Sequence, residues 1–356
     1  MAGLDMAWMR RNDHSVRARA LVASVAVVAA LASTGCGLRW ETDASVFPSP
    51  DAVTVARDAL ADAEAGVLAA AAPDAATDAT AANATTTAQA HLDVLGGAYD
   101  AYPGTTPSPS VSPAPDPTLS EAIRAARATA EDVAATMADE DADLAFLARS
   151  IDLDWALREL RTDRVNAGGP ANGANNTMYF PLADASDTSS AGFAPDAATT
   201  TSLSEHALSE LALKEDEARF AYETIAALEF DSLRQQALSR SRLHGERSDA
   251  LASVLATDPR TPLYQLRDGN LPDPGSREAL ALSIELDLGA RYAAALDGAS
   301  ATDATWLLNA AFDTYARSMV TEGFAPSDLP TLPGVAVIPA DSQSTAAPAA
   351  PSPSAG

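Results

Sequence analysis

Apolar residues between Ser202 and Gly323 recur at α-helical spacing, and this pattern constrains the fold more than any other feature of the chain. Apolar side chains three and four residues apart line one side of a helix, which must then be buried against other helices. Four such stripes follow one another here, and no stretch alternates apolar with polar residues as a half-buried strand does. We therefore expect an all-α fold with a four-helix bundle over residues 202–323.

Further helices are expected ahead of the bundle, within residues 51–165. Apolar residues again recur at helical spacing, and Thr118 with Glu121 matches the capping box that opens many helices. Glycines at 96 and 97 are typical of a helix end. The expected helices span Asp51 to Ala71, Thr87 to Leu95, Thr118 to about Ala138, and Asp141 to Leu160.

Four segments contain too few large apolar side chains to offset the entropy lost on ordering. One is made almost entirely of Ala, Thr and Asp, and the others are rich in Pro, Ser, Gly or Asn. We expect linkers at residues 72–90, 103–117 and 166–201, and a disordered tail at residues 324–356.

The start of the chain has the order of a bacterial lipoprotein signal peptide. Basic residues are followed by an apolar stretch from Ala20 to Ala32, then by small residues and Cys36. That stretch is shorter than the about 20 apolar residues that cross a bilayer. We expect a signal peptide at residues 1–35, lipidation of Cys36, a lipid-anchored N-terminus over residues 36–50, and a location on the outer face of the cytoplasmic membrane. The alternatives are secretion with a free thiol and a retained membrane anchor.

Charge and cysteine content exclude several classes of function. The formal net charge is -26, which argues against nucleic acid as a partner and against a basic patch for anionic lipids. Cys36 is the only cysteine, so neither disulfides nor thiolate metal sites are available to stabilise the fold. Stability must therefore come from buried apolar surface.

Three ionisable residues lie on or beside the apolar stripes of three different expected helices: Glu217, His244 and Glu285. A buried carboxylate is costly unless it is paired or binds a metal. Arg247 lies near His244 and offers a partner. We expect these four residues to form a polar cluster in the core of the bundle, or, as the alternative, to contribute to a metal site.

Ten residues of the segment 202–323 stand in a characteristic order and spacing. The start of the expected mature chain, Cys36 to Glu41, also contributes to the pattern. In this order the segment resembles the ferritin-like bundle domain of uncharacterised actinobacterial lipoproteins, a family defined as a domain of unknown function. The resemblance implies a fold, since no activity is established for the family. The residues that carry it are Glu217, Phe220, Tyr222, His244, Arg247, Leu251, Pro262, Tyr264, Glu285 and Tyr292.

Ferritin-like folds often hold two metal ions with a Glu-x-x-His motif on two helices, and no such motif occurs in this chain. Ser241 stands where the glutamate before His244 is required, and the fourth helix offers Asp313. We therefore expect no cofactor and a non-catalytic binding or scaffold module with a protein or small-molecule partner. The alternatives are an oxidoreductase with a reduced iron or manganese site, and a small-molecule carrier with a cavity near Ser241 and Ser248.

Overall fold

The computed structural model describes residues 50–97, 117–166, 192–196, 200–266 and 271–335. The regular elements of these residues are eight α-helices and one 3-10 turn, with no strand, so the all-α prediction is confirmed for them. Described residues from Asp51 on belong to one compact unit. In this part of the chain every helix is too short or too polar to span a bilayer. The helices are α2 (Ala52–Ala71), α3 (Ala79–Leu95), α4 (Leu119–Thr136), α5 (Ala142–Asn166), α6 (Glu205–Leu228), α7 (Asp231–Ser253), α8 (Pro274–Ala294) and α9 (Ala301–Ser318).

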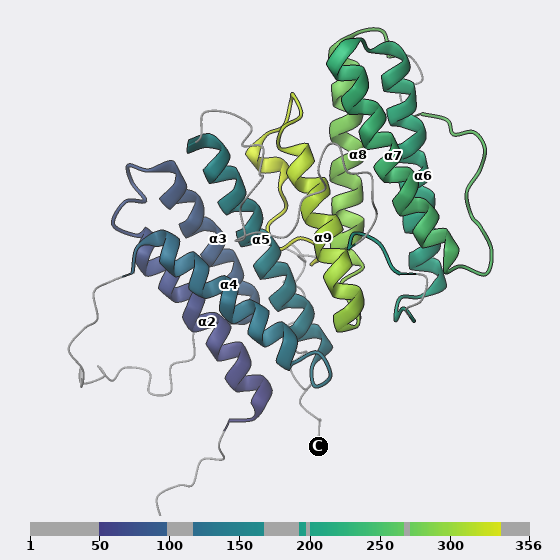
Figure 1. The fold of residues 1–356 in the computed structure, drawn as a ribbon. Helices are drawn as coiled ribbons and strands as arrows, with labels where there is room; N and C mark the ends of the chain where they lie inside the picture. Colours follow the sequence, from purple (N-terminus) through teal and green to yellow (C-terminus); the bar gives the residue numbers. More distant parts are fainter. Residues whose placement is uncertain (1–49, 98–116, 167–191, 197–199, 267–270, 336–356) are drawn as a thin grey trace, which may run out of the picture. The chain divides into compact units, whose positions relative to one another are not determined.

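Helices α2 to α5, the N-terminal helix set, begin at side chains that cap free backbone N–H groups. Asp51 caps α2 and Asp78 caps α3, each accepting a hydrogen bond at the helix start. The capping box of Thr118 and Glu121 at α4 is present as predicted. Helix α2 packs against α3 and α4, and α4 packs against α5 (Figure 1).

Residues 79–90 belong to α3, so the prediction of a linker over residues 72–90 is wrong for them. The buried side of α3 includes Ala81, Ala84 and Ala88, which are too small to stand out in composition. Because alanine side chains are small, the neighbouring helix can approach α3 closely. The close contact supplies dispersion energy, although α3 has few large apolar side chains. Gly96 ends the helix with φ of 85°, a conformation that favours glycine.

The other expected linkers lie mainly outside the described residues. For residues 103–117 only Pro117 is described, and for residues 166–201 the described part is Asn166, residues 192–196 and residues 200–201.

Helices α6 to α9 form the C-terminal helix set, in which α6 and α7 run antiparallel. The hydroxyl of Ser241 donates to the carbonyl of Arg219 at 3.2 Å, and that of Ser248 donates to the carbonyl of Ala212 at 2.9 Å. A Cβ added at Gly245, between the serines, would lie 3.1 Å from Cδ of Arg219. Small residues thus bring α7 close to α6. Both serines bond to α6 at the position where the small-molecule-carrier alternative requires a cavity.

The connection between α7 and α8 crosses from one end of the set to the other. At its start, Arg260 pairs with Asp249 near the end of α7. At its end, Arg277 at the start of α8 pairs with Glu229 at the α6–α7 turn, with Nε 2.5 Å from Oε1. Helices α7 and α8 therefore run parallel, while α6 and α8 run in opposite directions (Figure 1).

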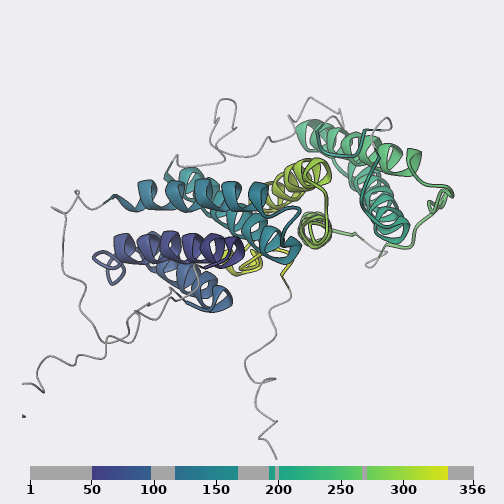
Figure 2. The ribbon, with the colours of Figure 1, turned by 90° about the horizontal axis from the view of Figure 1, so that it is seen from below.

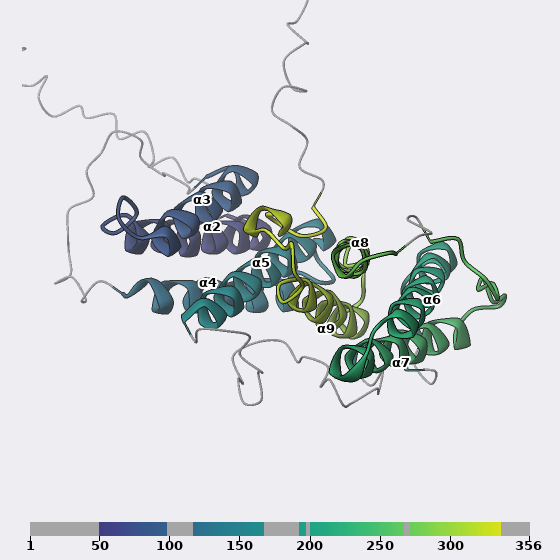
Figure 3. The same cartoon turned by 90° about the horizontal axis from the view of Figure 1, so that it is seen from above.

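Helices α5 and α9, the last of each set, pack against each other in parallel. Arg149 near the start of α5 donates to the carbonyl of Ala299 just before α9, and Arg164 near the end of α5 donates to Ala316. Figure 2 and Figure 3 show the two helices side by side in both views. Leu157 of α5 lies in one apolar core with residues of α6, α8 and α9, so the two sets share a core.

Residues 324–335, predicted to be part of a disordered tail, are ordered and pack on the helices. Leu329 lies in the core shared with α9, and Leu332 lies in the core of the N-terminal set. The carbonyl of Pro333 accepts a hydrogen bond from Ser150 of α5 at 2.9 Å. Two buried leucines thus order a segment that looks like a tail in composition, while residues 336–356 lie outside the described residues.

Candidate functional site: two buried polar clusters

Ionisable side chains from all four helices of the C-terminal set meet in its interior. We call this group the C-terminal polar cluster, and each member is at most 9% exposed. The structure thus brings His244, Glu285 and Arg247 together as predicted. The members are Glu215 and Tyr222 of α6, Arg240, His244 and Arg247 of α7, Glu285 and Tyr292 of α8, and Asp313 of α9.

His244 lies between two carboxylates. Its Nδ1 is 2.5 Å from Oε2 of Glu215, and its Nε2 is 3.5 Å from Oε1 of Glu285. Tyr222 stacks on the imidazole, with ring centroids 5.4 Å apart, and donates its hydroxyl hydrogen to Glu285 at 2.7 Å. Burial lowers the pKa of His244, but the charge and hydrogen bond of Glu215, with a contribution from Glu285, together outweigh it and raise the pKa above its ordinary value, which favours the protonated ring.

Two arginines of α7 neutralise the carboxylates of α8 and α9. Arg240 donates from Nε and Nη2 to the two oxygens of Glu285 at 2.6 and 2.5 Å, and from Nη1 to Asp313 at 2.7 Å. Arg247 donates from Nη2 to Asp313 at 2.6 Å. Burial raises the pKa of Glu285, but Arg240 and His244 together outweigh it and hold that pKa below its usual range. Burial also raises the pKa of Asp313, but Arg240 and Arg247 together hold it below its usual value. The carboxylates therefore stay ionised in the interior.

Glu217, predicted to belong to this cluster, lies outside it. Its side chain is 36% exposed and pairs with Lys214 at 2.6 Å. Glu215 takes the inward position instead, because residues two apart on a helix point to nearly opposite sides. Tyr292 donates its hydroxyl hydrogen to one oxygen of Glu215, and His244 contacts the other.

A second buried group lies in the N-terminal set and was not predicted from the sequence. We call Glu64 of α2, His91 of α3, and Asp154, Trp155 and Arg158 of α5 the N-terminal polar cluster. His91 again lies between two carboxylates, with Nδ1 3.1 Å from Glu64 and Nε2 3.0 Å from Asp154. Trp155 donates from Nε1 to Glu64 at 2.8 Å, and Arg158 donates from Nε to Asp154 at 2.7 Å.

The carboxylates of the N-terminal cluster favour a charged histidine. Burial lowers the pKa of His91, but hydrogen bonds to Asp154 and Glu64 outweigh it and raise the pKa to about 9. Burial raises the pKa of Asp154, but His91 and Arg158 outweigh it and lower the pKa below its usual value. Glu64 lies four residues after Leu60 on the apolar stripe of α2, which is the sequence signal that identifies its burial.

Each cluster is formally neutral when its histidine is protonated. In the N-terminal cluster, Glu64 and Asp154 are balanced by Arg158 and His91. In the C-terminal cluster, three carboxylates are balanced by two arginines and His244. Charge balance and dense hydrogen bonding are what permit ionised groups to be buried.

The donor atoms of the C-terminal cluster do not fit a metal ion. Among the described residues, no group of three or more His, Cys, Asp or Glu side chains is arranged to hold one. Both oxygens of Glu285 accept from Arg240, and His244 faces a carboxylate on each side. A cation at this position would have to displace buried arginines that already supply the positive charge.

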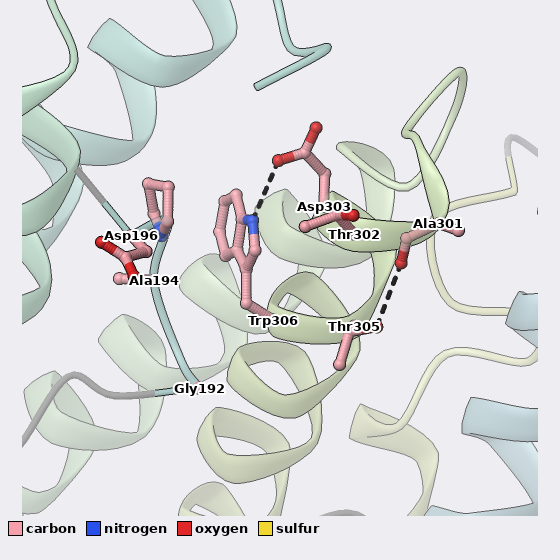
Figure 4. Close-up of a pocket in the computed structure, with 9 residues that line it drawn as sticks. Gly192, Ala194, Asp196, Ala301, Thr302, Asp303, Thr305 and Trp306 are labelled. Carbon is pink, nitrogen blue, oxygen red and sulfur yellow. Dashed lines mark hydrogen bonds between the residues drawn. The ribbon is translucent and has the colours of Figure 1, made fainter. Parts of the chain in front are cut away.

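An open pocket of about 480 Å³ lies at the start of α9, and none of the residues that line it belongs to either cluster (Figure 4). Its polar side chains already make bonds that hold the helix start. Asp303 accepts from the backbone N–H and hydroxyl of Ser202 and from Trp306 Nε1, the last at 3.1 Å. Figure 4 shows the indole of Trp306 lying between Asp303 and the segment that carries Ala194. The polar side chain of Asp303 in the pocket therefore has a structural role, which is to hold Ser202 at the start of α9.

No protein-family model, curated protein or solved structure matches this chain. The described residues define an all-α protein with two sets of four helices, each with a buried histidine between carboxylates. Cys36 and the predicted signal peptide lie outside the described residues.

Proposed function

We propose that this protein is a lipid-anchored module of the cell envelope, in which a ferritin-like bundle serves as a non-catalytic binding or scaffold element. One observation carries the non-catalytic assignment. The guanidinium groups of Arg240 and Arg247 satisfy Glu285 and Asp313, which are carboxylates that a ferritin-like metal centre would need. The cluster is thus built to stabilise the bundle.

The order and direction of the helices support the ferritin-like assignment. Bundles of this class have one long crossover among short connections, and here the crossover joins α7 to α8. Side chains from four helices also converge at the centre, as they do around a di-metal site. The buried histidine His244 takes the place of a ligand, but the usual Glu-x-x-His motif is replaced by Ser241-x-x-His244.

Metal analysis tests the proposal against its rival, an oxidoreductase that binds one iron or manganese ion. The convergence of Glu215, His244 and Glu285 is the observation that favours this rival. We expect substoichiometric iron and manganese by mass spectrometry after purification and after incubation with either ion. Stoichiometric metal that is lost in His244→Ala but kept in the control Glu217→Ala would overturn the non-catalytic assignment.

The envelope location rests on the basic residues, the apolar stretch and Cys36 of the sequence. Two or three acyl chains on the cysteine would hold the protein on the membrane, since each buried methylene contributes about 0.8 kcal/mol. We expect mass spectrometry of the mature N-terminus to find an acylated Cys36, and Cys36→Ser to release the protein from the membrane fraction. An uncleaved and unmodified Cys36 would contradict the assignment.

A further inference from the structure

The N-terminal and C-terminal helix sets repeat one plan. In each set the first two helices follow each other closely, a longer connection leads to the third, and a short one leads to the fourth. The first helix packs against the second and the third, and the third packs against the fourth, in both sets. Figure 1 shows that α2 and α4 run in opposite directions, as α6 and α8 do.

Residues of the first helices correspond within this plan. Both helices contain the motif Leu-Ala-x-x-Glu, and all three named positions are buried in each case. The glutamate of each motif contacts the buried histidine of the following helix, with an alanine seven residues before that histidine. The corresponding residues are Leu60, Ala61, Glu64, Ala84 and His91 in one set and Leu211, Ala212, Glu215, Ala237 and His244 in the other.

The fourth helices of the two sets, α5 and α9, also carry corresponding residues when both are counted from their first residue. Counted from Ala142 in α5 and Ala301 in α9, Asp154 and Asp313 occupy the same position, and each is an aspartate of its cluster. An arginine follows one turn later in each helix, and Ser150 of α5 corresponds in the same count to Asn309 of α9.

The segment after α9, residues 329–335, covers the polar cluster of the other set. The N–H of Leu332 donates to Asp154 at 3.3 Å, and Arg158 donates to the hydroxyl of Thr331 at 3.4 Å. Ser150 donates to the carbonyl of Pro333. This C-terminal strap therefore closes the N-terminal cluster and places Leu332 in the core beside it.

The segment between α5 and α6, residues 192–196, covers the C-terminal cluster in turn. The ring of Phe193 lies over the guanidinium of Arg247, with its centroid 5.0 Å from Cζ. Asn309 donates to the carbonyl of Gly192 at 2.8 Å. Asn309 and Ser150 occupy corresponding positions on the fourth helices. In each set, the side chain at this position therefore donates to a backbone carbonyl of the segment that follows the fourth helix of the other set.

We propose that the chain is an internal duplication of one four-helix unit, and that each copy's polar cluster is closed by the strap that follows the fourth helix of the other copy. This is the arrangement of a two-fold dimer with exchanged segments, joined here into one chain. The parallel packing of α5 on α9 places equivalent helices at the centre of the pair. The proposal does not depend on the proposed function.

Amide hydrogen exchange in full-length variants tests the exchange of straps. We expect Leu332→Ser to raise exchange rates about tenfold around His91 in α3 and to leave α7 unchanged, because opening is local when one segment is weakened. Phe193→Ser is expected to do the reverse, raising exchange around His244 in α7. Val320→Ser is the matched control, since Val320 follows α9 but is 39% exposed.

A second pair of variants keeps the test decisive if the strap substitutions unfold the protein. Ser150→Ala removes the bond to residues 329–335, and Asn309→Ala removes the bond to residues 192–196. We expect each to raise amide exchange in the strap that it releases. The proposal is overturned if either strap variant acts on its own set, if both act on one set, or if Ser150→Ala and Asn309→Ala leave the straps as protected as before.

Discussion

At the residue scale, the cost of removing charge from water decides which partners each cluster contains. The effective penalty is several kcal/mol per ion even after relaxation, and good geometry is needed to offset it. Arg240 provides that geometry with two parallel bonds to Glu285. When a substitution removes one member of an ion pair, the other member is left charged and buried. A single substitution in a cluster should therefore lower the free energy of unfolding by more than the net contribution of the ion pair itself.

Glu285→Ala is therefore expected to destabilise the protein by about 3–5 kcal/mol, because Arg240 would be left without its main counter-charge. Urea denaturation followed by circular dichroism measures the change. Glu217→Ala is the matched control on a partly exposed glutamate, with an expected change within about 0.5 kcal/mol. Equal effects of the two substitutions would contradict the placement of both residues.

His91 predicts a loss of stability in alkaline solution. Its folded pKa of about 9 lies above the ordinary 6.5, so the folded state binds the proton more tightly than the unfolded state. The resulting stabilisation is full below pH 6.5 and is lost as the pH rises through about 9, and it amounts to about 3 kcal/mol. Glu64 and Asp154 are the charged groups that face the ring, and Arg158 pairs with Asp154.

Denaturation midpoints between pH 6 and pH 10 measure this effect. His91→Gln should flatten the pH dependence, leaving the part that His244 contributes, whose pKa is raised by the neighbouring Glu215 although burial opposes it. A variant that keeps the full slope would show that His91 does not titrate in this range.

The sequence identified the chemistry of the C-terminal cluster more reliably than its register. His244, Glu285 and Arg247 lie together in the cluster, whereas Glu217, which the sequence also places there, lies outside it and Glu215 takes the inward position. The two glutamates stand two residues apart, each with apolar neighbours, and the deciding contact from Tyr292 of α8 is distant in sequence. Such a choice depends on tertiary packing, which periodicity does not resolve.

At the element scale, close approach of helices governs where glycine is required. A Cβ at Gly289 of α8 would lie 2.9 Å from Cε1 of Tyr315, a buried ring of α9 with little freedom to move. A Cβ at Gly66 of α2 would meet nothing within 4 Å. These two glycines provide a matched pair inside helices.

Gly289→Ala is expected to destabilise the protein by about 1–3 kcal/mol, because overpacking outweighs the better helix propensity of alanine. Gly66→Ala is expected to stabilise it by about 0.5–1 kcal/mol through that propensity alone. Thermal denaturation of both variants measures the changes. A stabilising Gly289→Ala would show that α8 and α9 lie farther apart than the structure has them.

Helix α3 shows why composition alone misjudged an element. Its residues are mainly Ala and Thr, which resemble a linker, yet its alanines pack on the neighbouring helix and His91 enters the N-terminal cluster. Small side chains stabilise a helix through contacts that depend on what lies opposite. The capping box of α4, by contrast, is local, and was predicted correctly from Thr118 and Glu121.

At the scale of the whole molecule, the contacts that join the two helix sets link residues that are far apart in sequence. Ser150 meets Pro333, and Arg149 meets Ala299. Neither contact leaves a periodic or compositional signal, so the sequence predicted the helices of both sets without predicting their shared core.

The shared core predicts that the two helix sets unfold together. Leu157 of α5 is fully buried in the core that also contains Leu307 of α9 and Leu288 of α8. Leu157→Ala should cost about 2–5 kcal/mol through lost contacts and the cavity left behind. Because Leu157 belongs to the N-terminal set but packs in the C-terminal core, amide exchange should rise equally in α3 and α7. For Leu157→Ala, increased exchange confined to one set, or two separate thermal transitions, would show that the sets are independent domains.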